Sequence, residues 1–73
     1  MFHIFLSNPD EAEEFVKEAS ESHNEINLES GSVAIDGKSL LGVLTMGVHR
    51  RLRVNVIGDD RDFVKRISRF VVA

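Results

Sequence analysis

The spacing of the apolar residues along the chain changes between a period of two, which is typical of strands, and the wider spacing of a helix. The chain begins with Phe2, Ile4 and Leu6 at alternate positions, which predicts a strand with one face toward a core. An element with one apolar face must cover that face with another element. The order of these periods therefore limits the fold more than any other feature.

A helix start follows the first strand. Asn8 is a favourable N-cap, Pro9 fits the first helical position, and Glu11 stands three residues after the cap, as in a capping box. Apolar residues then recur at helical spacing, which predicts a helix with one buried stripe and acidic side chains toward water. The stripe consists of Ala12, Phe15, Val16 and Ala19.

The middle of the chain predicts a β-hairpin and a short helix. Two alternating runs flank the turn at residues 29–32, which contains Gly31. The inward residues of the hairpin are expected to be Ile26, Leu28, Val33 and Ile35. Ser39 then suits the N-cap of a helix from Leu40 to Met46, which Gly47 can end.

The last third predicts one more strand and one more helix. Leu52, Val54 and Val56 alternate with polar residues, and residues 58–60 open the final helix. The apolar stripe expected on that helix is Phe63, Val64, Ile67, Phe70 and Val71. The order is thus β-α-β-β-α-β-α in a single domain, residues 1–73. The economical architecture is α+β, with a four-stranded antiparallel sheet and the helices on one face.

Composition narrows the class of protein. The chain has no cysteine, so it has neither a disulfide framework nor a thiolate metal site. No apolar run is long enough to span a bilayer, and the first residues do not have the pattern of a signal peptide. We therefore expect a cytoplasmic protein without membrane contacts.

The charges are distributed unevenly. Residues 1–36 contain Lys17 against nine acidic residues, whereas residues 37–73 contain eight basic residues against three acidic ones. Blocks of charge usually solvate a surface, and the basic half also suits an acidic protein or a second copy of the chain. Nucleic-acid binding is the weaker alternative, because the net charge is −3 and no aromatic residue alternates with the arginines.

The segment from Phe15 to Val48 resembles the HPr family, the histidine-containing phosphocarriers of the bacterial phosphotransferase system. The most specific part is KSLLGVLTMGV, residues 38–48, which is similar to the family's short second helix with its Lys-Ser pair. The resemblance implies an open-faced sandwich fold. It also implies partners among phosphotransferase-system enzymes or a transcriptional regulator, a link to sugar transport, and no cofactor.

The family's phosphoacceptor motif has no counterpart in this chain. The motif, Gly-x-His-x-Arg-Pro, presents a histidine just before the first helix, whereas residues 7–12 read Ser-Asn-Pro-Asp-Glu-Ala. A helix N-terminus favours a phosphate dianion, but the carboxylates of Asp10, Glu11, Glu13 and Glu14 would repel it. We therefore expect no histidine phosphocarrier activity at this position.

The resemblance implies two further features of the second helix. Ser39 matches a serine that a dedicated kinase phosphorylates in some bacteria, so it is a candidate regulatory phosphosite, with Lys38 beside it. Leu40, Leu41 and Leu44 match an exposed patch that docks protein partners. From the residues alone, Ser39 is a helix cap, and three leucines cannot all be buried on so short a helix.

The three histidines His3, His23 and His49 are interpreted as surface residues, because none has metal-ligand spacing and none matches the phosphoacceptor. No nucleophile–base pair is evident, so we expect no enzymatic activity. The leading hypothesis is a regulatory or adaptor module that binds proteins. The alternative is a phosphocarrier that uses a non-standard residue, for example His49 beside Arg50 and Arg51.

Overall fold

Five strands form one antiparallel sheet in the computed structural model, which describes residues 1–73. They are β1 (Phe2–Leu6), β2 (Glu25–Ser30), β3 (Val33–Asp36), β4 (Arg50–Ile57) and β5 (Val71–Val72). Their spatial order is β3-β2-β4-β1-β5, and every neighbouring pair is antiparallel. The α+β class and the antiparallel sheet are as the sequence predicts.

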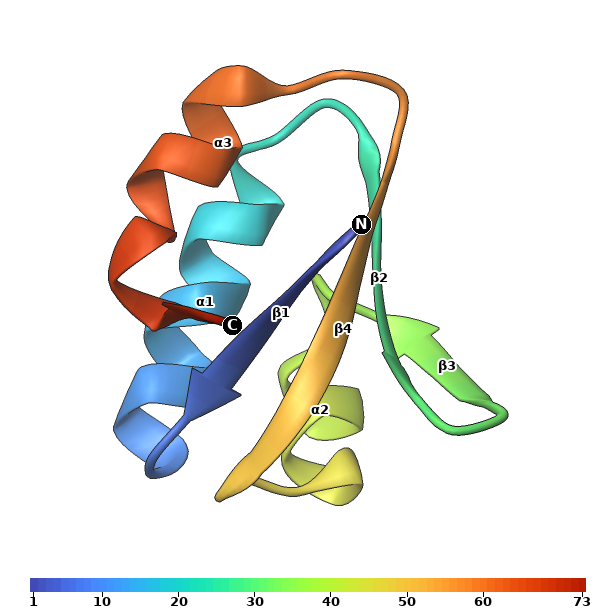
Figure 1. The fold of residues 1–73 in the computed structure, drawn as a ribbon, viewed down its shortest axis with the longest axis vertical. Helices are drawn as coiled ribbons and strands as arrows, with labels where there is room; N and C mark the ends of the chain where they lie inside the picture. Colours follow the sequence, from blue (N-terminus) through green and yellow to red (C-terminus); the bar gives the residue numbers. More distant parts are fainter.

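The helices lie on one face of this sheet (Figure 1). They are α1 (Pro9–Ser20), α2 (Leu40–Met46) and α3 (Arg61–Arg66), and a 3₁₀ turn, η1 (Ser68–Phe70), follows α3. The bounds of α2 are those expected from Ser39 and Gly47. Gly47 ends the helix with a φ of 102°, a conformation that favours glycine.

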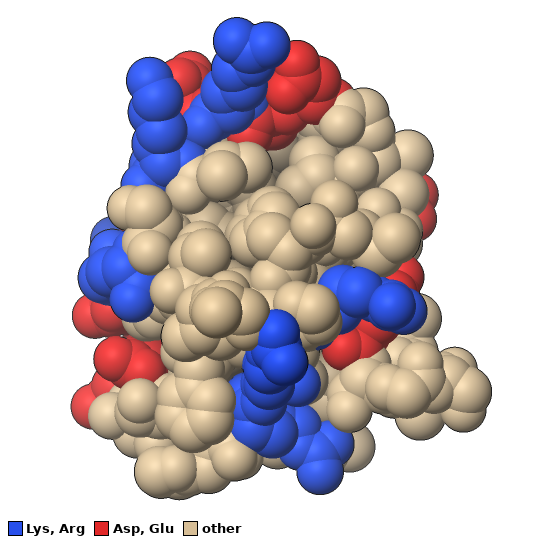
Figure 2. Space-filling view, viewed as in Figure 1, with Lys and Arg blue, Asp and Glu red and all other residues tan.

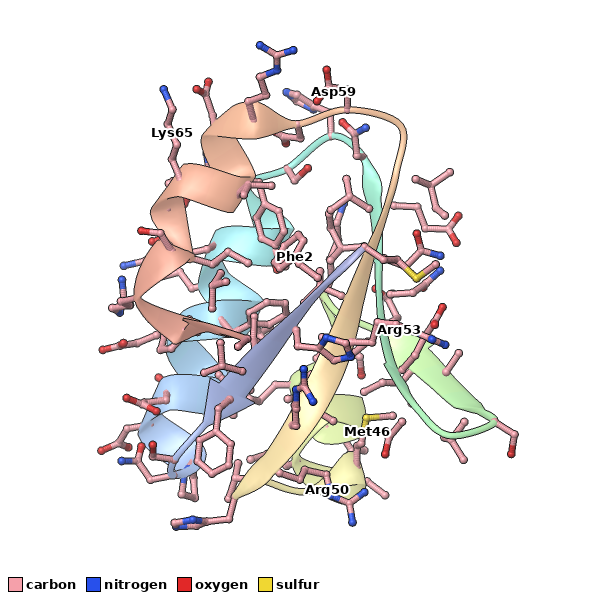
Figure 3. The ribbon with its side chains drawn as sticks, in the orientation of Figure 1. Phe2, Met46, Arg50, Arg53, Asp59 and Lys65 are labelled. Carbon is pink, nitrogen blue, oxygen red and sulfur yellow. The ribbon has the colours of Figure 1, made fainter.

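The core is a single apolar layer between the sheet and the helices. Phe15 of α1 and Phe63 of α3 meet edge to face, with ring centroids 5.9 Å apart. The fully buried residues are Ile4, Leu6, Ala12, Phe15, Ala19, Ile26, Leu28, Val43, Leu52, Val54, Phe63 and Ile67, and Phe70 is almost so. The opposite face of the sheet carries polar side chains, and Arg53 extends from β4 over β2 (Figure 3).

The prediction for the end of the chain was partly wrong. Helix α3 ends at Arg66, and Val71 lies in β5, a fifth strand that pairs with β1. Backbone groups along the outer side of β1 need hydrogen-bond partners, and Val71 and Val72 supply them. The turn η1 still places Phe70 in the core, whereas Val64 remains 37% exposed.

The expectation that Val33 points into the core was also wrong. Strand β3 is the edge of the sheet, and Val33 is 56% exposed. Its neighbour Ile35 is half-buried and packs against the core. The alternation correctly puts both residues on one face, but that face extends beyond the part of the sheet that the core covers.

Ion pairs join the acidic half to the basic half within one molecule. Glu18 of α1 pairs with Arg66 of α3 at 2.9 Å, and Glu14 pairs with Arg69 at 2.7 Å. Figure 2 shows basic side chains distributed over the face that it presents, with acidic ones beside several of them. Some of the acidic residues of the first half therefore form ion pairs with basic residues of the C-terminal segment.

A buried serine connects the ends of three helices. The Ser22 hydroxyl donates to Asp60 Oδ2 at 2.5 Å, and the Ser22 carbonyl accepts from Lys38 Nζ at 2.8 Å. Asp60 also caps α3 by accepting from the Phe63 N–H at 3.0 Å. The hydrogen bond from Ser22, and then the one from Phe63, lower the pKa of Asp60 below its ordinary value.

We expect Asp60→Asn to reduce the free energy of unfolding at pH 7, because the neutral amide keeps a capping oxygen but loses the charge-assisted bond with Ser22. The lowered pKa makes this stabilisation fully present above the ordinary pKa of aspartate, about 3.9, and removes it as pH falls through the folded-state value. Urea unfolding at several pH values measures the difference, which should shrink in acid. The exposed Asp59→Asn is the control, and a pH-independent difference for Asp60→Asn would contradict the account.

Candidate protein-interaction site

The connection between β1 and α1 is built as a helix cap. Asn8 Oδ1 accepts from the Glu11 N–H at 2.9 Å, and the Ser7 N–H donates to Glu11 Oε1 at 2.7 Å. Glu11 thus reaches one residue further back than in a standard capping box. Two side-chain oxygens thus occupy the Ser7 and Glu11 N–H groups, which are then not free to bind an anion.

Acidic side chains follow one side of α1 from its first turn. Asp10, Glu13 and Glu14 line a shallow hollow of about 350 Å³ together with Lys17. Of the charged groups in that hollow, Lys17 is the single cation, so the hollow is negatively charged. A phosphoryl group on a histidine carries negative charge of its own and would be repelled here.

The backbone of His49 lies next to the end of β1. Its N–H donates to the Leu6 carbonyl at 2.7 Å, and its ring packs edge to face on Phe5 with centroids 5.9 Å apart. The residue has a φ of 61°, in the left-handed region that is uncommon for residues other than glycine. The sequence indicated the turn before β4, but not that this turn meets the β1–α1 connection.

The other two histidines lie on the surface, as expected. His3 is on the open face of the sheet, with its Nδ1 3.4 Å from Arg51 Nη2, and His23 is exposed beyond α1.

Ser39 caps α2 as expected, since its Oγ accepts from the Gly42 N–H at 3.1 Å. A Cβ at position 42 would lie 3.2 Å from that oxygen, which accounts for a glycine inside the helix. The neighbouring Lys38 is anchored by its bond to the Ser22 carbonyl. The ammonium group is thus held at the end of α1, a contact that the sequence analysis did not predict.

Helix α2 buries one apolar residue and leaves its three leucines exposed, as expected for so short a helix. Val43 is fully buried, whereas Leu40, Leu41 and Leu44 are 37%, 77% and 41% exposed. We call these three residues the leucine patch. Helix α2 packs between α1 and β3, so the patch lies on a surface to which both α1 and the hairpin are close.

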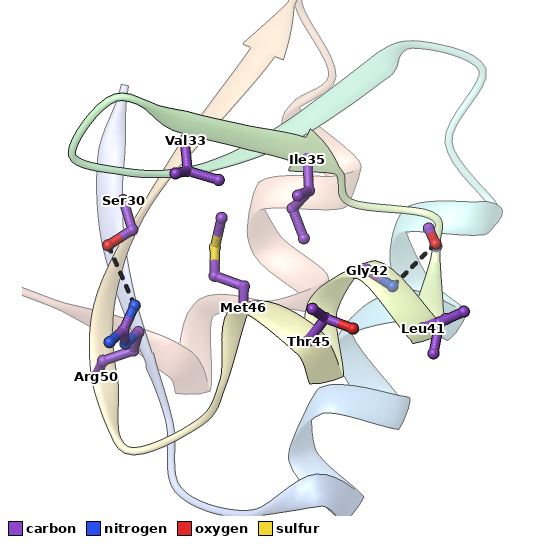
Figure 4. A pocket seen from close by; sticks show the side chains of 9 residues that line it. Ser30, Val33, Ile35, Leu41, Gly42, Thr45, Met46 and Arg50 are labelled. Carbon is purple, nitrogen blue, oxygen red and sulfur yellow. Dashed lines mark hydrogen bonds between the residues drawn. The ribbon is translucent and has the colours of Figure 1, made fainter.

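A groove of about 600 Å³ between α2 and β3, which Leu41 of the leucine patch also lines, was not expected from the sequence. Figure 4 shows Val33 and Ile35 of β3 above the helix, with Met46 directed toward them. Arg50 lies at one end, where its Nη1 is 3.5 Å from Ser30 Oγ. The sequence predicted that Val33 and Ile35 share one face of the strand, but it did not predict that β3 is the edge of the sheet.

Comparison with known families identifies the chain. Residues 10–72 match the family model described as "PTS HPr component phosphorylation site". The chain belongs to the HPr family. The match begins at Asp10, so the connection capped by Asn8 lies before the matched residues. None of the curated proteins matches the chain in sequence.

Solved structures of HPr-type proteins share this fold. HPr-C-His from Thermoanaerobacter tengcongensis superposes with a TM-score of 0.76 at 22% identity, over 94% of this chain and 89% of that one. The phosphocarrier protein HPr from Bacillus anthracis gives 0.72 at 21% identity, over 96% and 93%. Crh from Bacillus subtilis, described as a swapped, intertwined dimer, gives 0.66 at 19% identity, over 100% and 90%. At these identities the likeness concerns the fold.

We expect Asn8→Ala to reduce the free energy of unfolding by about 1 kcal/mol, because the Glu11 N–H loses its side-chain acceptor. Urea denaturation of the purified protein measures the effect. Asn8→Ser keeps a capping oxygen and serves as the control that should stay close to wild type. Equal stability of Asn8→Ala and wild type would show that this contact does not hold the helix start.

Proposed function

We propose that the chain is a regulatory or adaptor member of the HPr family. It binds other proteins through the leucine patch of α2 and does not carry a phosphoryl group at the start of α1. The observation that carries this proposal is the exposure of Leu40, Leu41 and Leu44 on a helix whose Val43 is buried. An exposed cluster of large apolar side chains on so small a domain calls for a partner.

The geometry at the start of α1 supports the absence of carrier activity. The side chains of Asn8 and Glu11 already accept from the N–H groups of Glu11 and Ser7, and no arginine accompanies them in residues 7–14. A bound dianion would have to displace these contacts and to approach Asp10, Glu13 and Glu14. Both effects oppose the transfer of a phosphoryl group to this place.

Ser39 is the proposed point of regulation. Its hydroxyl lies at the N-terminus of α2 and next to the leucine patch, so a phosphate there would change the charge of the docking surface directly. The backbone N–H groups of the first turn favour the added negative charge. Regulation at this serine is thus a local electrostatic change at the surface that binds the partner.

By resemblance, the partners are enzymes of the phosphotransferase system or a transcriptional regulator, in the cytoplasm. A homodimer is the other candidate assembly, and the swapped dimer described for Crh supports a test of it. The chain is not proposed to be an enzyme.

A second candidate is phosphoryl transfer through His49. Its backbone contact with Leu6 brings it next to the segment in which the family carries its histidine, and Arg50 follows it directly. The leading proposal and this alternative predict opposite results in one assay.

We expect no phosphoryl group on the protein after incubation with the general phosphotransferase enzyme and phosphoenolpyruvate, read by intact mass. The Bacillus anthracis HPr is the positive control in the same mixture. A mass gain of one phosphoryl group would overturn the non-carrier proposal, and its loss in His49→Gln would establish the alternative.

We expect the serine kinase of the HPr family, with ATP, to phosphorylate wild type and Thr45→Ala but not Ser39→Ala. Thr45 is the matched control because it is a hydroxyl residue exposed on the same helix. Peptide mass spectrometry locates the phosphate. An unlabelled wild type would leave Ser39 with its capping role alone.

A further inference from the structure

Strand β3 has an unpaired edge beside the groove. The Gly37 N–H donates to the Ile26 carbonyl at 2.7 Å, which fixes the direction of the bonds between the two strands. Hydrogen-bonded and non-hydrogen-bonded pairs alternate along an antiparallel ladder. From the register of Leu28 with Ile35, the backbone groups of Val33 and Ile35 point to β2, and those of Ala34 and Asp36 point outward.

One of the four outward backbone groups already has a hydrogen-bond partner. The Asp36 carbonyl accepts from the Ser39 N–H at 3.0 Å in the turn before α2. The N–H and carbonyl of Ala34 and the N–H of Asp36 remain available at the sheet edge. Such a row of free groups is a template for an additional strand.

The groove accommodates the side chains of an added strand. Val33 and Ile35 from β3 and Leu41 and Met46 from α2 form its apolar lining, and the cavity of about 600 Å³ lies between them (Figure 4). A strand paired with Ala34 would direct alternate side chains into this cavity. Helix α2 would cover those side chains from below.

The positive charge of Arg50 indicates the chemistry expected at one end of a bound strand. Arg50 lines the groove, no acidic residue lines it, and Arg50 takes part in none of the four ion pairs of the protein. Its contact with Ser30, which is paired with Val33, places it at the first residue of β3. An antiparallel strand would reach this arginine near its C-terminal end.

We propose that the edge of β3 and the groove against α2 bind an extended peptide segment of another protein by strand addition. The segment has apolar side chains at alternate positions and a carboxylate toward its C-terminal end that pairs with Arg50. Main-chain hydrogen bonds and side-chain pockets act together in this mode of recognition. The site lies between β3 and α2. It shares Ser39 and Leu41 with the surface of the proposed function, whereas Leu40 and Leu44 do not line it.

The test is a selection from a display library of random linear peptides on the full chain. We expect a consensus of alternating apolar residues followed by an acidic one. A synthetic peptide of that consensus should perturb the Ala34 and Asp36 amide resonances. A selection without such a consensus would overturn the proposal.

Two variants separate the edge from the apolar surface. Ala34→Pro removes an outward N–H without touching the β2 ladder and should weaken binding of the selected peptide roughly tenfold or more. Ala34→Thr keeps the N–H and should bind as wild type. Arg50→Glu, with the edge intact, should weaken the acidic peptide roughly tenfold, and an otherwise identical peptide with an amide in place of the acid much less.

The same variants distinguish a peptide bound at the edge of β3 from a second copy of the chain and from a peptide bound at the leucine patch. Equal binding by wild type, Ala34→Pro and Arg50→Glu would overturn the proposal. Dimerisation of wild type that Ala34→Pro abolishes, measured by analytical ultracentrifugation, would assign the edge to a second copy of the chain and also overturn it. Loss of binding in Leu40→Ser, with Ala34→Pro unaffected, would assign the peptide to the leucine patch instead. Thermal melting of each variant establishes that the comparison is made between folded proteins.

Discussion

The apolar layer in which Phe15 meets Phe63 is the interaction on which the rest of this structure depends. It joins α1 to α3 over one face of the sheet, and it contains all the fully buried apolar side chains of the 73-residue chain. The second face of the sheet carries mostly polar residues. Helix α2 contributes only Val43 to the fully buried set, so its leucines remain on the surface. The proposed docking surface is therefore a consequence of how little of α2 the core requires.

Local chemistry accounts for the parts of the fold that the sequence predicted best. The start of α1 and both ends of α2 are fixed by Asn8, Ser39 and Gly47, whose effects act within one helical turn. The end of α3 has no such signal. Phe63, Ile67 and Phe70 continue at helical spacing, and tertiary pairing of Val71 with β1 ends the pattern. The exposure of Leu40, Leu41 and Leu44 could be predicted, because so short a helix cannot bury all three leucines. The groove could not be predicted, because it depends on β3 being the edge strand of the sheet.

The uneven distribution of charge has a structural use inside the molecule. Glu14 and Glu18 hold the C-terminal segment through Arg69 and Arg66, and exposed pairs of this kind each contribute at most about 1 kcal/mol. Two other acids, Asp10 and Glu11, lie in the first turn of α1, where they favour the helix and disfavour a phosphate. The acids of the first turn thus stabilise the helix, and in the proposed function they also oppose the phosphoryl transfer for which the HPr family is known.

The most direct test of this account places a histidine where the chain has its cap. Asn8→His, incubated with the general phosphotransferase enzyme and phosphoenolpyruvate, is analysed by intact mass for a phosphoryl group. The account predicts that the variant stays unmodified, because the carboxylates of Asp10 and Glu11 still occupy the first turn of the helix and residues 7–14 contain no arginine. A variant that accepts the phosphoryl group and passes it on would show that the acidic first turn does not prevent transfer, and would contradict the account.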